Sequence, residues 1–299
     1  MKIALFNATG TEIAELPAIV AAMNKWALEM AAMHQEEPLE TALVTDVASL
    51  DPDVWRPMAV LDNADEQGVL GDHETDANGR PTSRVFVKPI TDNGGTMTKG
   101  ALSLSVAATH ELGEIRGNPF ACDWSQIRDG LTLQAKERCD LVESQSYEID
   151  GIAASNFLGP RAFSAGPGPY DRLGLLANVD DGPGPGNYRI IWDVANTSGP
   201  TPEFGDGYAP WKKELKAKNP ASRFGELLAL RSEFALAAHV DLEVRRLAAI
   251  AQFGREDPGL ITLPSLSDVE RFLCSKCAMP LAGKALCSLH PLAGRIKAA

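Results

Sequence analysis

The chain has 299 residues, 44% of them hydrophobic, and carries a formal net charge of −12. A chain of this length exceeds one small domain and can bury a core of good size. Its acidic balance lacks the basic footprint of a protein that binds duplex nucleic acid. No apolar run reaches the about 18 residues of a membrane span, and the first residues turn acidic too soon for a signal peptide. We therefore expect a cytoplasmic protein whose partners are proteins or peptides.

The first part of the chain predicts one helix and then several strands. Between Pro17 and Met33, apolar residues recur at helical spacing among many alanines. Shorter apolar alternations predict strands around Leu43 and from Met58 to Leu61. After an acidic loop and the turn sequence Asn-Gly-Arg-Pro, a further strand is predicted from Ser83 to Pro89.

A second helix is predicted from about Ser103 to Arg116. Gly117 and Pro119 should end it, because glycine suits a left-handed residue after a helix and proline cannot continue one. Further on, Tyr147 and Ile149 precede the turn pair Asp150-Gly151, a pattern that indicates a β-hairpin.

The composition changes in the second half of the chain. Glycine and proline are dense from Ser164 to Tyr208, where the segment YRIIWDV predicts an embedded strand. A basic run at residues 211–220 is typical of a solvated linker, and Pro220 to Phe253 predict one long helix or two. These changes divide the chain into a first domain of residues 1–165, a Gly/Pro-rich extension (166–219), a helical connector (220–256) and a tail (257–299).

The second predicted helix carries a pattern that suits a metal ion. A helix places His110 and Glu114, four residues apart, on one face, where both can bind the same ion. Glu111 is rotated by about 100° from His110 and can reach a water on that ion as a general base. Glu114 stands where His-Glu-x-x-His has its second histidine, and carboxylate is an accepted zinc ligand. Alternatively, Glu111 and Glu114 are solvated helix residues and His110 is a hydrogen-bonded core residue.

A third ligand has to come from another segment. The residue ten positions after the first histidine is Phe120, which cannot bind a metal. Among the acidic residues that follow, we place Glu143 first and Asp140 second. His73 is either a ligand or a residue that faces the substrate.

Three segments within roughly residues 55–163 carry a resemblance to a known family. They read LDNADEQGVLGDHETDANGRPTSRVFV, SLSVAATHELGEIRGNP and CDLVESQSYEIDGIAASNF. Together they resemble a family of bacterial and tailed-phage proteins with zincin-like metallopeptidase domains and a Ser-His-Glu-x-x-Glu helix. The resemblance implies a zincin-like fold and functional positions on the helix, in the acidic cluster and in the earlier loop: His110, Glu111, Glu114, Asp140, Glu143, Asp62, Asp65 and His73.

The chain departs from the family pattern at three positions. Thr109 replaces the usual serine before His110, and Asp72 stands where an aromatic residue is common. Asn118 replaces an aspartate before the proline, which weakens the case for a carboxylate ligand there.

The tail contains a second candidate metal site. Cys274 and Cys277 form one Cys-x-x-Cys pair, Cys287 and His290 form a Cys-x-x-His pair, and nine residues separate the two pairs. Four such ligands suit tetrahedral zinc and leave no open position, so we expect a structural zinc-ribbon-like site. Such modules bind proteins or nucleic acids, and the acidity of the chain favours protein.

Together these observations predict an α+β protein: a zincin-like domain with a Gly/Pro-rich extension, a long helical connector and a small zinc ribbon. The favoured function is peptide hydrolysis by a phage or prophage protein, with zinc-activated water and Glu111 as the base. The substrate is expected along an edge strand near Arg84 to Lys88. The alternative is a non-catalytic virion structural or assembly protein that contacts phage structural proteins through the same scaffold.

Overall fold

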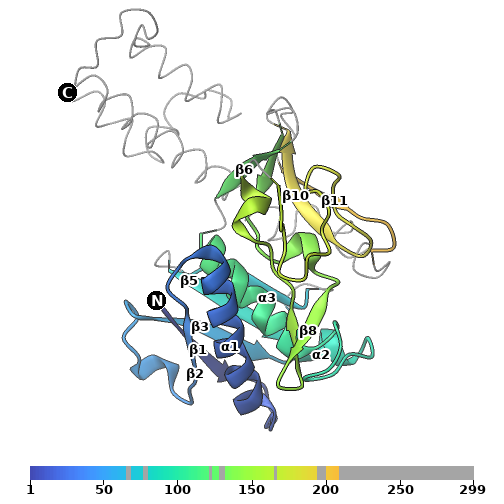
Figure 1. Cartoon of the computed structure of the whole chain (residues 1–299). Helices are drawn as coiled ribbons and strands as arrows, with labels where there is room; N and C mark the ends of the chain where they lie inside the picture. Colours follow the sequence, from blue (N-terminus) through green and yellow to red (C-terminus); the bar gives the residue numbers. More distant parts are fainter. Residues whose placement is uncertain are drawn as a thin grey trace, which may run out of the picture.

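The structure, a computed structural model, describes residues 1–64, 69–76, 80–120, 123–127, 132–164, 167–193 and 200–208. These residues form a mixed α+β fold with several sheets and few helices (Figure 1). The predicted connector and the tail, with Cys274, Cys277, Cys287 and His290, lie outside the described residues. Within the described ranges, no helix is long and apolar enough to cross a membrane.

The main sheet has five strands in the order β2-β1-β3-β5-β4. The first four run parallel, whereas β4 runs antiparallel to β5 at the edge. The strands are β1 (Lys2–Asn7), β2 (Glu40–Leu43), β3 (Trp55–Leu61), β4 (Gly71–Thr75) and β5 (Pro81–Phe86).

Two long helices, α1 (Leu16–His34) and α3 (Leu104–Gly117), pack on this sheet. Trp26 of α1 and Leu112 of α3 belong to the same buried cluster as Leu5 and Val60 of the sheet. The helices approach closely at Gly113, where an added Cβ would lie 2.8 Å from the Trp26 ring. Figure 1 shows α1 and α3 side by side across the sheet.

A hairpin of β8 (Ser146–Ile149) and β9 (Ile152–Ser155) packs against both helices. Asp150 and Gly151 both have positive φ, as a tight hairpin turn requires. The Trp26 Nε1 group donates a hydrogen bond to the Ser155 carbonyl over 2.7 Å, which ties α1 to β9.

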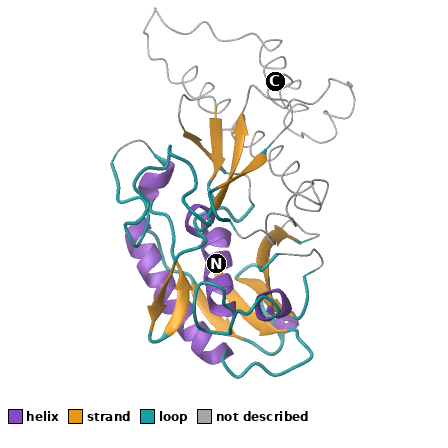
Figure 2. Ribbon diagram, turned by 90° about the vertical axis from the view of Figure 1, so that its right-hand side faces the viewer, coloured by secondary structure: helices purple, strands orange, loops and turns teal. Residues whose placement is uncertain are grey.

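A second sheet of four antiparallel strands has the order β11-β10-β7-β6. It stands at one end of the main sheet and its helices (Figure 2). Its strands are β6 (Trp124–Ile127), β7 (Thr132–Ala135), β10 (Tyr188–Asp193) and β11 (Thr201–Phe204). The boundary predicted at residue 165 therefore separates strands of one sheet, because β7 pairs with β10. Four short helices complete the described fold: η1 (Val47–Ser49), α2 (Val87–Thr91), η2 (Asp140–Val142) and η3 (Pro160–Phe163).

The predicted helices from Pro17 and from Ser103, the strands at Leu43 and Met58, the hairpin and the strand in YRIIWDV are all confirmed. The strand predicted to reach Pro89 ends at Phe86 instead, because the chain turns into α2. The prediction that an edge strand lies near Arg84 to Lys88 was also wrong. β5 lies between β3 and β4, so β4 is the edge strand beside α3.

Candidate metal centre

Helix α3 is fixed at its start and near its middle. Ser103 caps its start, since its side-chain oxygen accepts a hydrogen bond from Val106 N over 3.3 Å. Thr109 Oγ1 donates to the Ser105 carbonyl and accepts a hydrogen bond from Ser155 N, which joins α3 to β9. Thr109 therefore fills the serine position of the resembled pattern with a hydroxyl that holds the helix in place.

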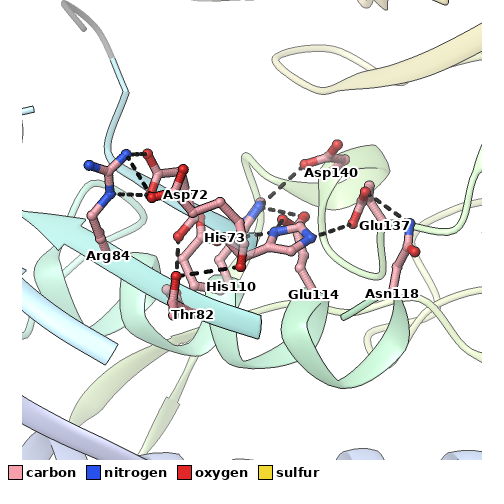
Figure 3. Close-up of polar contacts among 12 residues, drawn as sticks. Asp72, His73, Thr82, Arg84, His110, Glu114, Asn118, Glu137 and Asp140 are labelled. Atoms are coloured by element: carbon pink, nitrogen blue, oxygen red, sulfur yellow. Dashed lines mark hydrogen bonds and ion pairs between the residues drawn. The ribbon is translucent and has the colours of Figure 1, made fainter. Parts of the chain in front are cut away.

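The first candidate metal group joins α3 to η2. His110 Nε2 lies 2.8 Å from Glu114 Oε1 and 3.3 Å from Asp140 Oδ1 (Figure 3). One donor atom from each of the three residues lies within 4.8 Å of the others. Glu114 and Asp140 are buried, and the His110 side chain is 12% exposed. The structure thus brings together three predicted residues, with the second choice, Asp140, in the third position.

Glu143, the first choice for the third ligand, belongs to neither candidate metal group among the described residues. Its carboxylate lies by Tyr208. Burial raises the pKa of the Tyr208 hydroxyl most, and the negative charge of Glu143 raises it further. Asp140 and Glu143 sit at the two ends of η2, so this short turn directs only Asp140 toward His110.

A second candidate group joins α3 to the edge strand β4. His73 Nδ1 lies 3.3 Å from Glu114 Oε2 and 3.6 Å from Glu111 Oε2. All three residues are buried, and their donor atoms also lie within 4.8 Å of one another. Gly71 makes this approach possible, because a Cβ there would lie 2.7 Å from Glu111 Oε1.

Glu137 is a member of the site that the sequence analysis missed. Its Oε2 lies 3.7 Å from His73 Nε2, on the opposite side of the ring from Glu111. Asn118 Nδ2 donates a hydrogen bond to Glu137 Oε1 over 3.1 Å, and Asn118 Oδ1 accepts one from Asp123 N. Nothing in the local sequence pairs Glu137 with His73, since the contact depends on how β7 leads into η2 beside α3.

Asp72 and Asp62, from the loop that carries part of the resemblance, make contacts outside the two candidate metal groups. Arg84 donates hydrogen bonds to both carboxylate oxygens of Asp72, over 2.9 and 2.6 Å. Asp62 Oδ2 accepts a hydrogen bond from Gly10 N. Asp65 lies outside the described residues. None of these contacts brings Asp62 or Asp72 into the two candidate metal groups.

The charges inside the cluster perturb one another strongly. Burial raises the pKa of Glu111 to about 7, although His73 acts in the opposite direction. Burial also acts against the charged form of Glu114, but His110 and His73 together hold its pKa well below the usual value. Burial lowers the His110 pKa, and Glu114 and Asp140 outweigh that effect and raise it well above the usual value.

The donor set fits a divalent cation. Imidazole nitrogens and carboxylate oxygens are accepted ligands of zinc and of other divalent transition metals. Glu111 Oε2 and Glu114 Oε1 are buried, and their close contacts are with histidine nitrogens. Burying such oxygens is costly unless a cation compensates them.

Searches against protein-family models, curated proteins and solved structures found no match to this chain.

Proposed function

We propose that this protein is a zincin-like, metal-dependent peptidase whose divalent cation, preferably zinc, is held by His110, Glu114 and Asp140. The observation that carries the proposal is the convergence of His110 Nε2, Glu114 Oε1 and Asp140 Oδ1 on one point beside Glu111. A bound cation of this kind polarises a scissile carbonyl and makes a bound water more acidic. The remaining steps belong to the chain's own side chains.

Glu111 is the group best suited to take a proton from the attacking water. It precedes Glu114 on the same helix and lies at the side of the cluster that faces β4. A pKa of about 7 matches a general base that works near neutral pH, because both protonation states are then accessible. In the proposed cycle Glu111 accepts this proton and returns it to the leaving amine.

The edge strand β4 supports a binding mode for the substrate. β4 pairs with β5 along one side, and no strand among the described residues pairs with its other side. An extended peptide can add to such an edge through main-chain hydrogen bonds, which places its carbonyl groups along α3. The substrate class that this geometry favours is therefore an extended segment of polypeptide.

The burial of the cluster favours a second candidate function. Glu111, Glu114 and Asp140 expose 5% of their surface or less, as expected of a scaffold that keeps its centre closed. A non-catalytic structural or assembly protein of a phage virion would use the same fold for contacts with other virion proteins. In that case Glu111 has no proton to transfer.

One experiment separates the two functions. The full chain, loaded with zinc, is incubated with a diverse peptide library, and the products are identified by mass spectrometry. We expect cleavage by the wild-type protein, loss of cleavage in Glu111→Gln, and unchanged cleavage in Glu148→Gln, a control on the exposed end of β8. Absence of cleavage by the wild-type protein, with zinc bound and the fold intact, overturns the peptidase proposal.

A further inference from the structure

We propose that the centre takes a second divalent cation, held by His73, Glu111 and Glu114, with Glu114 shared between the two ions. This inference rests on the proposed function, because the second ion would lie next to the ion held by His110, Glu114 and Asp140. Glu114 directs Oε1 toward His110 and Oε2 toward His73, at 2.8 and 3.3 Å. A carboxylate whose two oxygens face different imidazoles is arranged to bridge two ions, as in sites where the metals are about 3.5–4 Å apart.

The second position has a complete set of donors. His73 Nδ1, Glu111 Oε2 and Glu114 Oε2 come from two elements, β4 and α3, that pack directly on each other. Each of these side chains is at least nine-tenths buried. Glu111 Oε2 is buried inside this group, and it faces His73 Nδ1 at 3.6 Å.

The far side of His73 is oriented as in a metal ligand. A histidine that binds a metal through one ring nitrogen usually directs the other toward a carboxylate, which sets the tautomer and the ring plane. His73 Nε2 faces Glu137 Oε2 at 3.7 Å, and Asn118 holds the other oxygen of Glu137. The chain Asn118–Glu137–His73 thus leaves Nδ1 directed at Glu111 and Glu114.

The charge of the cluster agrees with two ions. Four buried carboxylates meet two histidines here, and these carboxylates belong to Glu111, Glu114, Glu137 and Asp140. With neutral histidines as ligands, the four carboxylates carry as many negative charges as two divalent cations carry positive charges.

The second ion has a consequence for the proposed reaction. Glu111 is both a ligand of the second ion and the base of the proposed hydrolysis. When the second ion is bound to Glu111 Oε2, it lowers the basicity of this carboxylate, so Glu111 accepts a proton from water less readily. The first equivalent of metal is therefore expected to activate hydrolysis, and the second to suppress it.

The test uses Mn²⁺ alone as the probe, on the full chain with Cys274, Cys277 and Cys287 replaced by serine to remove the predicted tail ligands. Bound metal is counted by equilibrium dialysis and elemental analysis. Electron paramagnetic resonance then reports whether the ions are magnetically coupled, as ions bridged by one carboxylate are. We expect two coupled ions in this parent protein, and one uncoupled ion in both His73→Gln and Glu111→Gln.

His34→Gln is the matched control, because the His34 side chain is only 5% exposed and contacts the Leu158 carbonyl outside the cluster. It should retain two coupled ions. The second position is overturned if the parent binds a single ion that His73→Gln and Glu111→Gln both retain, and the first position then still stands. If the folded parent binds no Mn²⁺ and no Zn²⁺, both the second position and the proposed function fail.

Discussion

His73 Nδ1 lies 3.3 Å from Glu114 Oε2, and this contact joins the edge strand β4 to the helix α3 inside the protein. Glu114 is at the same time 2.8 Å from His110 on its own helix. One carboxylate therefore connects two histidines that come from different elements of the fold.

Gly71→Ala should damage the second metal position and leave the first largely intact. The added Cβ would lie 2.7 Å from Glu111 Cγ and Oε1, so the Glu111 side chain has to move. We expect a loss of about 1–3 kcal/mol in the free energy of unfolding, typical of overpacking, and a weaker second Mn²⁺ in dialysis. Gly10→Ala is the control, since its Cβ would meet only Asp62 Oδ2 at 3.8 Å. Equal Mn²⁺ binding by the two variants would contradict the prediction.

Asn118→Ala should weaken metal binding without removing a ligand. Asn118 holds Glu137, and Glu137 faces His73, so the substitution releases the group that orients the imidazole. Loss of such an outer contact typically lowers metal affinity about 10–100-fold. Titration with Mn²⁺ measures this change, and Asn93→Ala, at an exposed position just after α2, is the control. An affinity equal to that of the control would show that Glu137 does not orient His73.

The stability of the metal-free protein should fall as the pH rises from about 4.5 to 7. Burial raises the pKa of Glu111 from 4.5 to about 7, so the folded state binds this proton more tightly than the unfolded state does. The resulting stabilisation is complete below 4.5 and is lost as the pH approaches 7, a change on the order of 3 kcal/mol. The raised pKa of His110 acts in the same direction at higher pH. Glu114, whose pKa is lowered, adds stability above 4.5 that is lost only in more acidic solution.

Urea denaturation in the presence of a chelator, at pH values from 5 to 8, measures this dependence. Glu111→Gln should flatten the decline between pH 5 and 7 and should make the metal-free protein more stable at pH 8, because the amide carries no charge to bury. A decline of the same size in Glu111→Gln would assign it to other groups.

Cys139 should resist alkylation for as long as the protein is folded. The thiol is fully buried beside α3, and burial raises its pKa far above the usual value, so little thiolate forms at neutral pH. Iodoacetamide labelling at pH 8, read by peptide mass spectrometry, should modify Cys139 only after denaturant is added. Rapid labelling of this residue in native buffer would mean that the packing between α3 and η2 opens readily.

Much of the fold was predictable from local patterns. The apolar period around Trp26 predicted the first long helix, and Gly117 and Pro119 marked the end of the second. The turn pair Asp150-Gly151 predicted the hairpin. The strands β4, β6, β7 and β11 were not predicted, because they are short or carry polar residues at positions that only tertiary contacts bury. β1 was also missed, although its apolar residues Ile3, Ala4 and Leu5 are a local signal for a buried strand. His73 and Gln134 are examples, since both are buried although their strands look hydrophilic.

Only the part of the candidate site that lies on helix α3 was predictable from the sequence. The spacing of His110, Glu111 and Glu114 on a helix was sufficient to place them together. The sequence did not show that Asp140, rather than Glu143, is the residue that lies beside His110. A short 3-10 turn decides which of the two carboxylates faces the helix. Glu137 left no local signal, since its role depends on Asn118 and His73 from other segments.

The most direct test of the central claim is anomalous diffraction from crystals of the full chain grown with zinc. The account predicts an anomalous peak within about 2.2 Å of His110 Nε2 and of carboxylate oxygens of Glu114 and Asp140. Zinc found elsewhere in the crystal, with no peak at these three residues, would contradict it.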